Sequence, residues 1–379
     1  MMTRFIEAAT QIDHPALRAW KSEGRPVVGY TCSFVPTELF HAADILGIRL
    51  RGIETDGLEI GDAYFGPYIC SFPKCVLQLA GRGRYAMLDG VVITPGCDSM
   101  RRLYECWQKA GEDYPGIVPS FFHYLDVPHK TVSHRIDWFV EQLNALRTAL
   151  EERYDVIISD DKLKDAIDLF NTGKRLIDEL ENLRKLPFPV ISGKDAFAIH
   201  VAGTVMPRDA FNRELENLLH HLKQQKTGEA DSRKRLMLIG SINDDIELVN
   251  LMESSQQAVV VADNLCFGSR THQREISPGE APMESLARSY LETSTCPRMF
   301  GKYRERLEAL LDKVDAYRVD GVVLQNIRFC DLHGSENGLF ERDLEKQGIP
   351  CLKLEREYGP LTETGRIRMR IDAFLEGLA

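Results

Sequence analysis

Two stretches of the chain repeat one pattern, a short β-branched run followed by a Cys-Asp pair. Asp89-Gly90-Val91-Val92-Ile93 leads to Cys97-Asp98, and Asp320-Gly321-Val322-Val323-Leu324 leads to Cys330-Asp331. Each run reads as a buried strand between turn-forming residues. Open parallel sheets place their ligands just past the carboxyl ends of their strands. We therefore expect two similar sheet units that bring two thiols to one shared site, although free cysteines are also often buried for packing alone.

Strand and helix patterns alternate in the first and last thirds of the chain, which is typical of doubly wound parallel sheets. In the first third the predicted strands are 26–31, 48–53, 88–93 and 120–125, and the predicted helices are 4–24, one from Pro36, 74–80 and 98–110. In the last third the predicted strands are 235–240, 258–262, 320–324 and 350–354, and the predicted helices are 244–255, 302–317, 338–347 and 364–377.

Three local features refine these predictions. The first helical stretch is expected to break at Asp13-His14-Pro15, because proline favours a helix start. A loop containing Asp62-Ala63-Tyr64-Phe65 is expected before Cys70. The charged stretch 224–234 reads as an exposed linker.

The sequence thus predicts an α/β fold with two doubly wound, flavodoxin- or Rossmann-like parallel-sheet domains. Residues 1–130 form the first domain, which carries Cys70 and Cys97. Residues 233–379 form the second, which carries Cys330, and residues 131–232 form a helical domain between them.

Charge and hydropathy exclude several classes of partner. The net charge of −10 argues against a nucleic-acid or anionic-membrane partner. No apolar run approaches the roughly 20 residues that span a bilayer, and the N-terminus lacks the apolar core of a signal peptide. We therefore expect a cytoplasmic protein. Neither a GxGxxG nor a Walker A sequence occurs, so the residues themselves predict no nucleotide-binding loop.

The nine cysteines favour metal binding or reactivity over disulfides in a reducing compartment. No CxxC occurs, so a thiol site is expected to be assembled by the fold. Iron–sulfur clusters are held by cysteine thiolates, usually four, and a site with three leaves one iron free to bind another ligand. Cys106 and Cys351 are expected to be packing residues, and a helix start between Cys70 and Cys75 would point Cys75 elsewhere.

Several polar residues near these cysteines have two readings each. Asp98 is expected to cap a helix beginning at 99, and Asp331 to do the same for its own helix. Arg101, Arg102 and Arg328 either stabilise an anionic cluster or are solvated. His333 is a possible metal ligand, although a satisfied loop histidine is the simpler reading. Ser33, before a helix start, suits an anion or a thioester carbonyl, and the alternative is an ordinary capped helix.

The ordered set of motifs resembles the 2-hydroxyacyl-CoA dehydratase and benzoyl-CoA reductase family over nearly the whole chain. The stretches that carry the resemblance are Gly29 to Glu38, the Cys70 segment, Leu88 to Val92, Cys97 to Tyr104, Asp126 to Lys130, Phe329-Cys330-Asp331, Leu354 to Gly359 and Arg366 to Leu375. No single motif is decisive, but the set in this order is specific.

The resemblance implies a [4Fe–4S] cluster bound by Cys70, Cys97 and Cys330, with Ser33 near the substrate. It implies a homologous partner subunit, in a heterodimer or homodimer, and an ATP-hydrolysing iron–sulfur activator that injects one electron at low potential. The expected activity is that of an (R)-2-hydroxyacyl-CoA dehydratase acting on an acyl-CoA. The alternative within the family is a benzoyl-CoA reductase subunit, in which electrons enter an aromatic ring.

Three further readings stay open. A branch of the family carries a double-cubane cluster and reduces small molecules. Cys266 and Cys296 could supply two of its extra cysteines, but a further cysteine expected near Arg84-Tyr85 is absent and Cys75 is out of register. The chain could also be an electron-relay subunit without its own substrate site, or a non-catalytic α/β binding protein with buried thiols.

Overall fold

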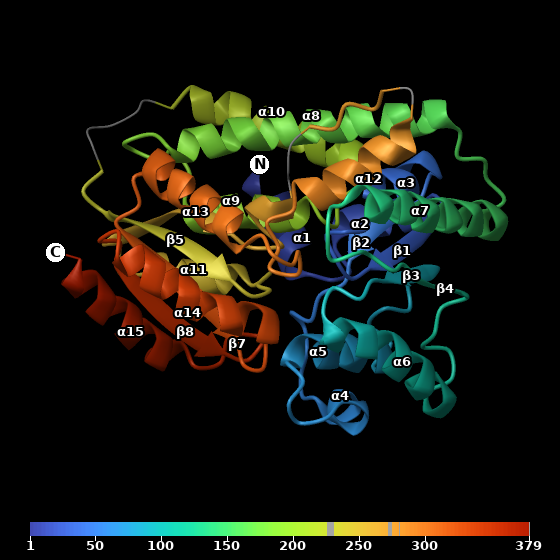
Figure 1. Ribbon diagram of the computed structural model, residues 1–379, viewed down its shortest axis with the longest axis horizontal. Coiled ribbons are helices and arrows are strands. Elements are labelled where there is room, and N and C mark those ends of the chain that lie inside the picture. Colours follow the sequence, from blue (N-terminus) through green and yellow to red (C-terminus); the bar gives the residue numbers. More distant parts are fainter. Residues whose placement is uncertain (226–230, 272–274, 280, 379) are drawn as a thin grey trace.

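Two four-stranded parallel sheets form the framework of the computed structural model, which describes residues 1–225, 231–271, 275–279 and 281–378 (Figure 1). The first sheet has the order β2-β1-β3-β4 and the second has the order β6-β5-β7-β8. Because each sheet places its strands in the same order along the chain, second-first-third-fourth, the predicted pair of similar units is confirmed. The strands are β1 Val27–Tyr30, β2 Leu46–Arg49, β3 Gly90–Ile93, β4 Phe121–Tyr124, β5 Lys234–Gly240, β6 Ala258–Asn264, β7 Gly321–Ile327 and β8 Cys351–Arg356.

The repeated Asp-Gly pairs begin the third strand of each sheet and make equivalent bonds. The carboxylate of Asp89 accepts a hydrogen bond from the backbone N–H of Val27 at 2.8 Å. The carboxylate of Asp320 accepts one from the N–H of Arg235 at 2.6 Å. In both sheets the aspartate thus ties the start of the third strand to the first strand, and this sets the register that carries the strand towards its cysteine.

The N-terminal helices follow the predicted pattern closely. The predicted break separates α1 (Met2–Thr10) from α2 (Pro15–Ser22), and His14 caps α2 by accepting a hydrogen bond from the Leu17 N–H at 3.3 Å. The helix predicted from Pro36 is α3 (Thr37–Ala42), with Pro36 at the capping position. The next predicted helices are α5 (Ser71–Gly81) and α6 (Asp98–Asp113).

Three predictions in this unit are wrong. The predicted strand 48–53 is β2, which ends at Arg49, because Arg51 turns away to donate to the carbonyls of Ala8, Ala9 and Gln11 at the end of α1. Residues 59–64, placed in a loop, form the helix α4 (Glu59–Tyr64). Asp98 does not cap α6, because it is the first helical residue and Cys97 occupies the capping position.

The last third differs from prediction at two helices. Helix α14 (Asp331–Glu345) begins directly after Cys330 instead of at 338, so Asp331 is likewise the first helical residue and not the cap. Helix α12 (Pro282–Glu292) was not predicted. The other helices confirm their predictions, namely α11 (Ile246–Glu253), α13 (Tyr303–Tyr317) and α15 (Thr364–Gly377).

The middle third is helical, as predicted. It contains α7 (Ser133–Tyr154), α8 (Asp160–Arg184), α9 (Gly193–Ala202) and α10 (Arg208–Lys223). Figure 1 shows α8 and α10 running side by side along one edge of the molecule, past both sheets. Helix α8 contacts α3 of the first unit and β6 of the second, so this segment braces the two sheet units. The domain boundaries stay a prediction, and the predicted linker lies partly outside the described residues.

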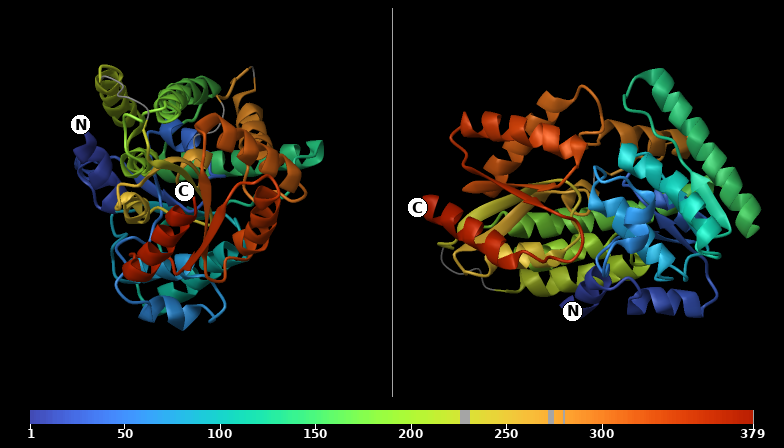
Figure 2. Two further views of the ribbon diagram at one scale, coloured as in Figure 1. Left: turned by 90° about the vertical axis from the view of Figure 1, so that its left-hand side faces the viewer. Right: turned by 90° about the horizontal axis from the view of Figure 1, so that it is seen from below.

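The carboxyl edges of the two sheets meet in the interior. Arg49, at the end of β2, donates from its side chain to the carbonyl of Cys266, just past β6. The right-hand view of Figure 2, seen from below, shows the two units side by side. Within the described residues no helix is long and apolar enough to cross a bilayer.

His14 should make folding stability sensitive to acid. Burial, assisted by the charge of Arg51, lowers its pKa from 6.5 to about 3. The unfolded chain therefore binds a proton below pH 6.5 that the folded chain rejects, and stability should fall by roughly 1.4 kcal/mol per pH unit below that point. His14→Asn keeps a capping side chain and should flatten this slope in chemical denaturation measured between pH 7 and 5. An unchanged slope would assign the acid sensitivity to other groups.

Candidate thiol site between the two sheet units

Three cysteines occupy the same structural position at the starts of three helices. Cys70 is the capping residue of α5, Cys97 that of α6 and Cys330 that of α14. Cys97 and Cys330 follow the equivalent strands β3 and β7, as predicted. The backbone N–H groups of Phe72, Met100 and His333, near the starts of these helices, lower the pKa of the respective thiol, but burial outweighs them and raises it. Helix N-termini favour negative charge, so these positions suit thiolates.

Electrostatic interactions link the Cys97 thiol to Cys70 and Cys330, and the Cys330 thiol to Cys70. Burial raises the pKa of the Cys97 thiol, and Cys70 and Cys330 raise it further. Burial raises the pKa of Cys330 to about 12, and Cys70 contributes again. Cys70 belongs to a large apolar cluster that includes residues of both sheet units, and Cys97 and Cys330 pack against it. Cys70 and Cys97 thus come from the first unit and Cys330 from the second, and their meeting at one site stays a prediction.

Among the described residues, no three His, Cys, Asp or Glu side chains are arranged to ligate one metal ion. In a four-iron cube each thiolate binds a different iron, so the ligands stand farther apart than those of one ion. Three thiols at helix N-termini, in a protected apolar setting, fit such a cube in donor type and charge.

Buried polar networks fix the turns that present two of the thiols. The guanidinium of Arg298, 2% exposed, donates to the carbonyls of Pro95, Val127 and Pro128, and so fastens the turn before Cys97. Past β7, the Ser241 hydroxyl accepts from the Ile327 N–H at 2.7 Å and fixes the strand end before Cys330. Buried, satisfied networks of this kind hold a site rigid.

The loop after β8 joins the second unit to the helix that begins at Cys70. The Tyr358 N–H donates to the Ser71 hydroxyl at 2.7 Å, and that hydroxyl donates to the Glu357 carboxylate at 2.8 Å. The Tyr358 hydroxyl accepts from the Gly52 N–H at 2.7 Å, and its ring packs edge-on against Phe72 at 4.8 Å. Sequence reasoning did not find this junction, because its partners are nearly 300 residues apart.

A second set of thiols lies beside the first. Burial raises the pKa of the Cys296 thiol, and Cys32 and Cys266 raise it too. Burial lowers the pKa of the Arg49 guanidinium, but the thiols of Cys266 and Cys32 outweigh burial and raise it. Arg49 is 3% exposed, so its charge faces thiols in the interior. Cys266 and Cys296 were considered at the outset, whereas Cys32 was missed although it follows β1 as Cys97 follows β3.

Ser33 follows β1 and lines two adjoining small cavities. Their volumes are about 40 and 30 Å³, and both are also lined by Lys174, Thr271 and Tyr290. The Tyr290 hydroxyl donates to Glu38 at 2.6 Å, and the Lys174 ammonium lies 3.8 Å from the same carboxylate. Ser33 does not cap α3, because Pro36 holds that position and no side chain caps the helix. The polar cavity rather than a helix terminus therefore defines its surroundings.

The remaining candidates divide between packing and surface positions. Cys106 contacts the Tyr64 carbonyl from within α6, and Cys351 begins β8 and packs in a core, so both packing predictions are confirmed. Cys75 points at the Tyr358 carbonyl at 3.7 Å, away from the start of α5.

His333 lies in α14 and not in a loop, and burial lowers its pKa well below the usual range. Arg101, Arg102 and Arg328 are half-exposed and pair with carboxylates.

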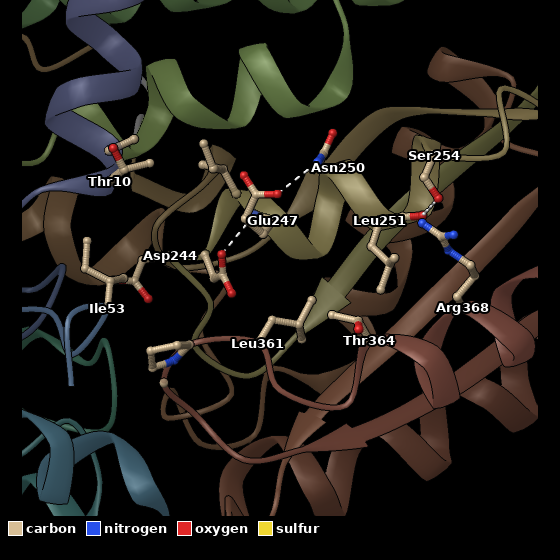
Figure 3. Close-up of a pocket in the computed structure, with 15 residues that line it drawn as sticks. Thr10, Ile53, Asp244, Glu247, Asn250, Leu251, Ser254, Leu361, Thr364 and Arg368 are labelled. Atoms are coloured by element: carbon tan, nitrogen blue, oxygen red, sulfur yellow. Dashed lines mark hydrogen bonds between the residues drawn. The ribbon is translucent and has the colours of Figure 1, made fainter. Parts of the chain in front are cut away.

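A roomier cavity lies apart from the thiols. It encloses about 600 Å³ between α1, α11 and the start of α15 (Figure 3). Asp244, Asp245 and Glu247 face it from one side, and Leu361 and Arg368 from the other. None of its lining residues is a cysteine. The thiol site is thus a packed interior junction and not this open cavity.

Comparison with known proteins shows the family to which the chain belongs. Residues 32–378 match the family model of the 2-hydroxyglutaryl-CoA dehydratase D-component. The chain belongs to this family. It is 29% identical to a benzoyl-CoA reductase subunit of Thauera aromatica, covering 84% of this chain and 83% of that protein. It is 22% identical to the (R)-phenyllactyl-CoA dehydratase beta subunit of Clostridium sporogenes, covering 96% and 94%. The predicted resemblance is confirmed.

A third relative is likewise a dehydratase subunit. The chain is 20% identical to the beta subunit of (R)-2-hydroxyglutaryl-CoA dehydratase from Acidaminococcus fermentans, covering 96% of this chain and 95% of that one. The chain is therefore a subunit of the dehydratase or reductase type.

The Tyr358 hydroxyl should contribute measurably to stability. In Tyr358→Phe the buried Gly52 N–H loses its partner while the ring contact with Phe72 stays. An unsatisfied buried donor costs about 1–3 kcal/mol, so the free energy of unfolding should fall by that amount. Urea denaturation measures it, with Tyr114→Phe, at a partly exposed tyrosine, as the control. A loss no larger than that of the control would show that the junction does not depend on this bond.

Proposed function

We propose that this chain is the iron–sulfur subunit of an enzyme that acts on a coenzyme A thioester, most closely of the (R)-2-hydroxyacyl-CoA dehydratase type. The observation that carries the proposal is that Cys70, Cys97 and Cys330 each stand at a helix N-terminus, the first two in one sheet unit and the third in the other. A [4Fe–4S] cluster is the group whose ligand type and number this arrangement suits. The benzoyl-CoA reductase type shares the same site, and the thiol positions do not separate the two.

The chain's own residues have defined tasks in this proposal. The three helix N-termini stabilise thiolates once their protons leave, and metal binding supplies the energy for that loss. The cluster, when bound, supplies one-electron chemistry at low potential. Ser33 and the hydroxyls beside it offer hydrogen bonds to a thioester carbonyl in the adjoining cavities. The packed apolar surroundings exclude water from the site.

The proposal includes two protein partners. One is a homologous subunit, because the relatives of this chain are themselves named as single subunits of larger enzymes. The other is an ATP-hydrolysing iron–sulfur activator that supplies the electron. An acyl-CoA is the substrate, and neither nucleic acid nor a membrane takes part.

Iron analysis of the anaerobically purified chain tests the cluster. We expect a brown protein with about four irons per chain, and Cys330→Ser should remove most of that iron because it takes away one of three protein ligands. Cys351→Ser, at a thiol that packs in a different core, should leave the iron content unchanged. Full iron content in Cys330→Ser would remove this residue from the ligand set, and a colourless wild-type chain would overturn the proposal.

A second candidate function is favoured by the second set of thiols. Cys32, Cys266 and Cys296 lie beside the first three, so six thiols are available for two linked cubes, as in the double-cubane reductases of small molecules. Such a chain should hold about eight irons instead of four. The triple variant Cys32→Ser, Cys266→Ser, Cys296→Ser should then halve the iron, with Cys106→Ser as the control. About four irons in the wild type and in the triple variant would exclude this candidate.

A further inference from the structure

Two exposed aromatic residues stand directly outside the thiol site. Tyr68 is 78% exposed and lies two residues before Cys70, and Phe329 is 41% exposed and lies directly before Cys330. Their rings meet edge-on with centroids 5.7 Å apart, although they come from different sheet units. The pair therefore bridges the two units at the surface next to two of the three thiols.

The backbone at Phe329 is held in an unfavourable conformation. Its φ is +64°, in the left-handed region that bulky side chains rarely adopt. A glycine or asparagine would fit this position at lower cost. Such conformations cluster at functional sites. The ring of Phe329 is exposed and lies against the ring of Tyr68.

The size of this aromatic patch fits a transient protein partner. Full coverage of the two rings would remove only roughly 200 Å² of aromatic surface, whereas a permanent subunit interface buries 2,000 Å² or more in total. Charged side chains of both signs surround the rings, among them the exposed Arg328, which pairs with Glu355 at 3.3 Å, and the exposed Asp331. A small aromatic centre with a polar rim is the anatomy of weak, fast-exchanging redox encounters.

We propose that the Tyr68–Phe329 pair is the docking contact for the protein that delivers electrons to the thiol site. The assignment rests on the proposed function, because it needs a redox group held by Cys70, Cys97 and Cys330. A donor seated on the two rings would stand one or two residues along the chain from Cys330 and Cys70, two of the residues that would hold that group. The pair would thus place a bound donor near two of the three thiols.

Reduction kinetics with two reductants test the assignment. The anaerobically purified chain is reduced either by its ATP-dependent activator protein or by titanium(III) citrate, which needs no docking surface, and cluster bleaching is followed by stopped flow. In the double variant Tyr68→Ala, Phe329→Ala, reduction by subsaturating activator should slow by about tenfold or more, as for loss of an interface hot spot. The rate with titanium(III) citrate and the iron content should not change.

Two further variants sharpen the result. Ile157→Ala is the control for loss of an exposed apolar side chain. Ile157 is 74% exposed in the connection between α7 and α8, and its replacement should leave the rates of reduction by the activator and by titanium(III) citrate unchanged. Phe329→Gly relieves the left-handed strain, so it should raise Tm and yet slow reduction by the activator. A merely structural role would move stability and reduction in the same direction.

Each other outcome overturns the assignment in a distinguishable way. Equal reduction of wild type and double variant by the activator overturns the docking role alone. Faster reduction of the double variant by titanium(III) citrate, with no loss in the activator reaction, would make the pair a shield against solvent. A wild-type chain that holds no iron, or that the activator does not reduce, overturns the proposed function and the docking role together.

Discussion

The thiol site depends on the junction between the loop after β8 and the start of α5. Neither sheet unit holds all three thiols, since Cys70 and Cys97 come from the first and Cys330 from the second. Ser71, adjacent to Cys70, accepts from the Tyr358 N–H and donates to Glu357, so the second unit is hydrogen-bonded to the first beside a ligand position. Two units packed through apolar contacts alone could slide by an ångström or more, whereas directional bonds to buried groups fix their separation.

Burial and helix N-termini act in opposite directions on these thiols, and burial is the larger effect. Burial raises the pKa of Cys330 to about 12 although the His333 N–H lowers it. The chain alone therefore keeps its thiols protonated at neutral pH and buries no free negative charge. A bound metal centre would displace the protons and supply the opposite charge, and the helix N-termini would then favour the thiolates. The same packing that disfavours a bare thiolate would protect such a centre from water.

The sequence predicted those parts of the fold that arise from local patterns. The Asp-Gly-Val-Val repeat located both third strands, and the thiols that follow them, because a buried parallel strand leaves a continuous apolar run. Helix α12 carried a readable signal as well, with Pro282 at its first position and Met283, Leu286 and Leu291 on one face. That helix could have been predicted from residue spacing alone.

Other elements depend on partners far away in the chain and left no local signal. The first N–H groups of α4 are satisfied by the Gln78 side chain, which accepts from Ile60 at 2.8 Å. The first turns of α14 contain Gly334 and Gly338, which are poor helix formers. Tertiary hydrogen bonds stabilise that helix instead. Glu336 accepts a hydrogen bond from Arg306, and the Asn337 side chain donates one to the Gln325 carbonyl. Cys330 is the capping residue of α14. The sequence therefore shows no local sign of the helix start that positions this thiol.

Two buried arginines place positive charge in the interior between the sheets. Arg49 and Arg298 are 3% and 2% exposed. The hydrogen bonds that they donate go to carbonyls of Cys266, Pro95, Val127 and Pro128, which are neutral. A buried cation is costly unless an opposite charge compensates it. The thiols of Cys266 and Cys32 and the Tyr30 hydroxyl can become negative beside Arg49, and Arg298 lies near Cys32, Cys296 and the Asp126 carboxylate. Negative charge on these thiols, or on a ligand beside them, would therefore add to the compensation of both guanidinium groups.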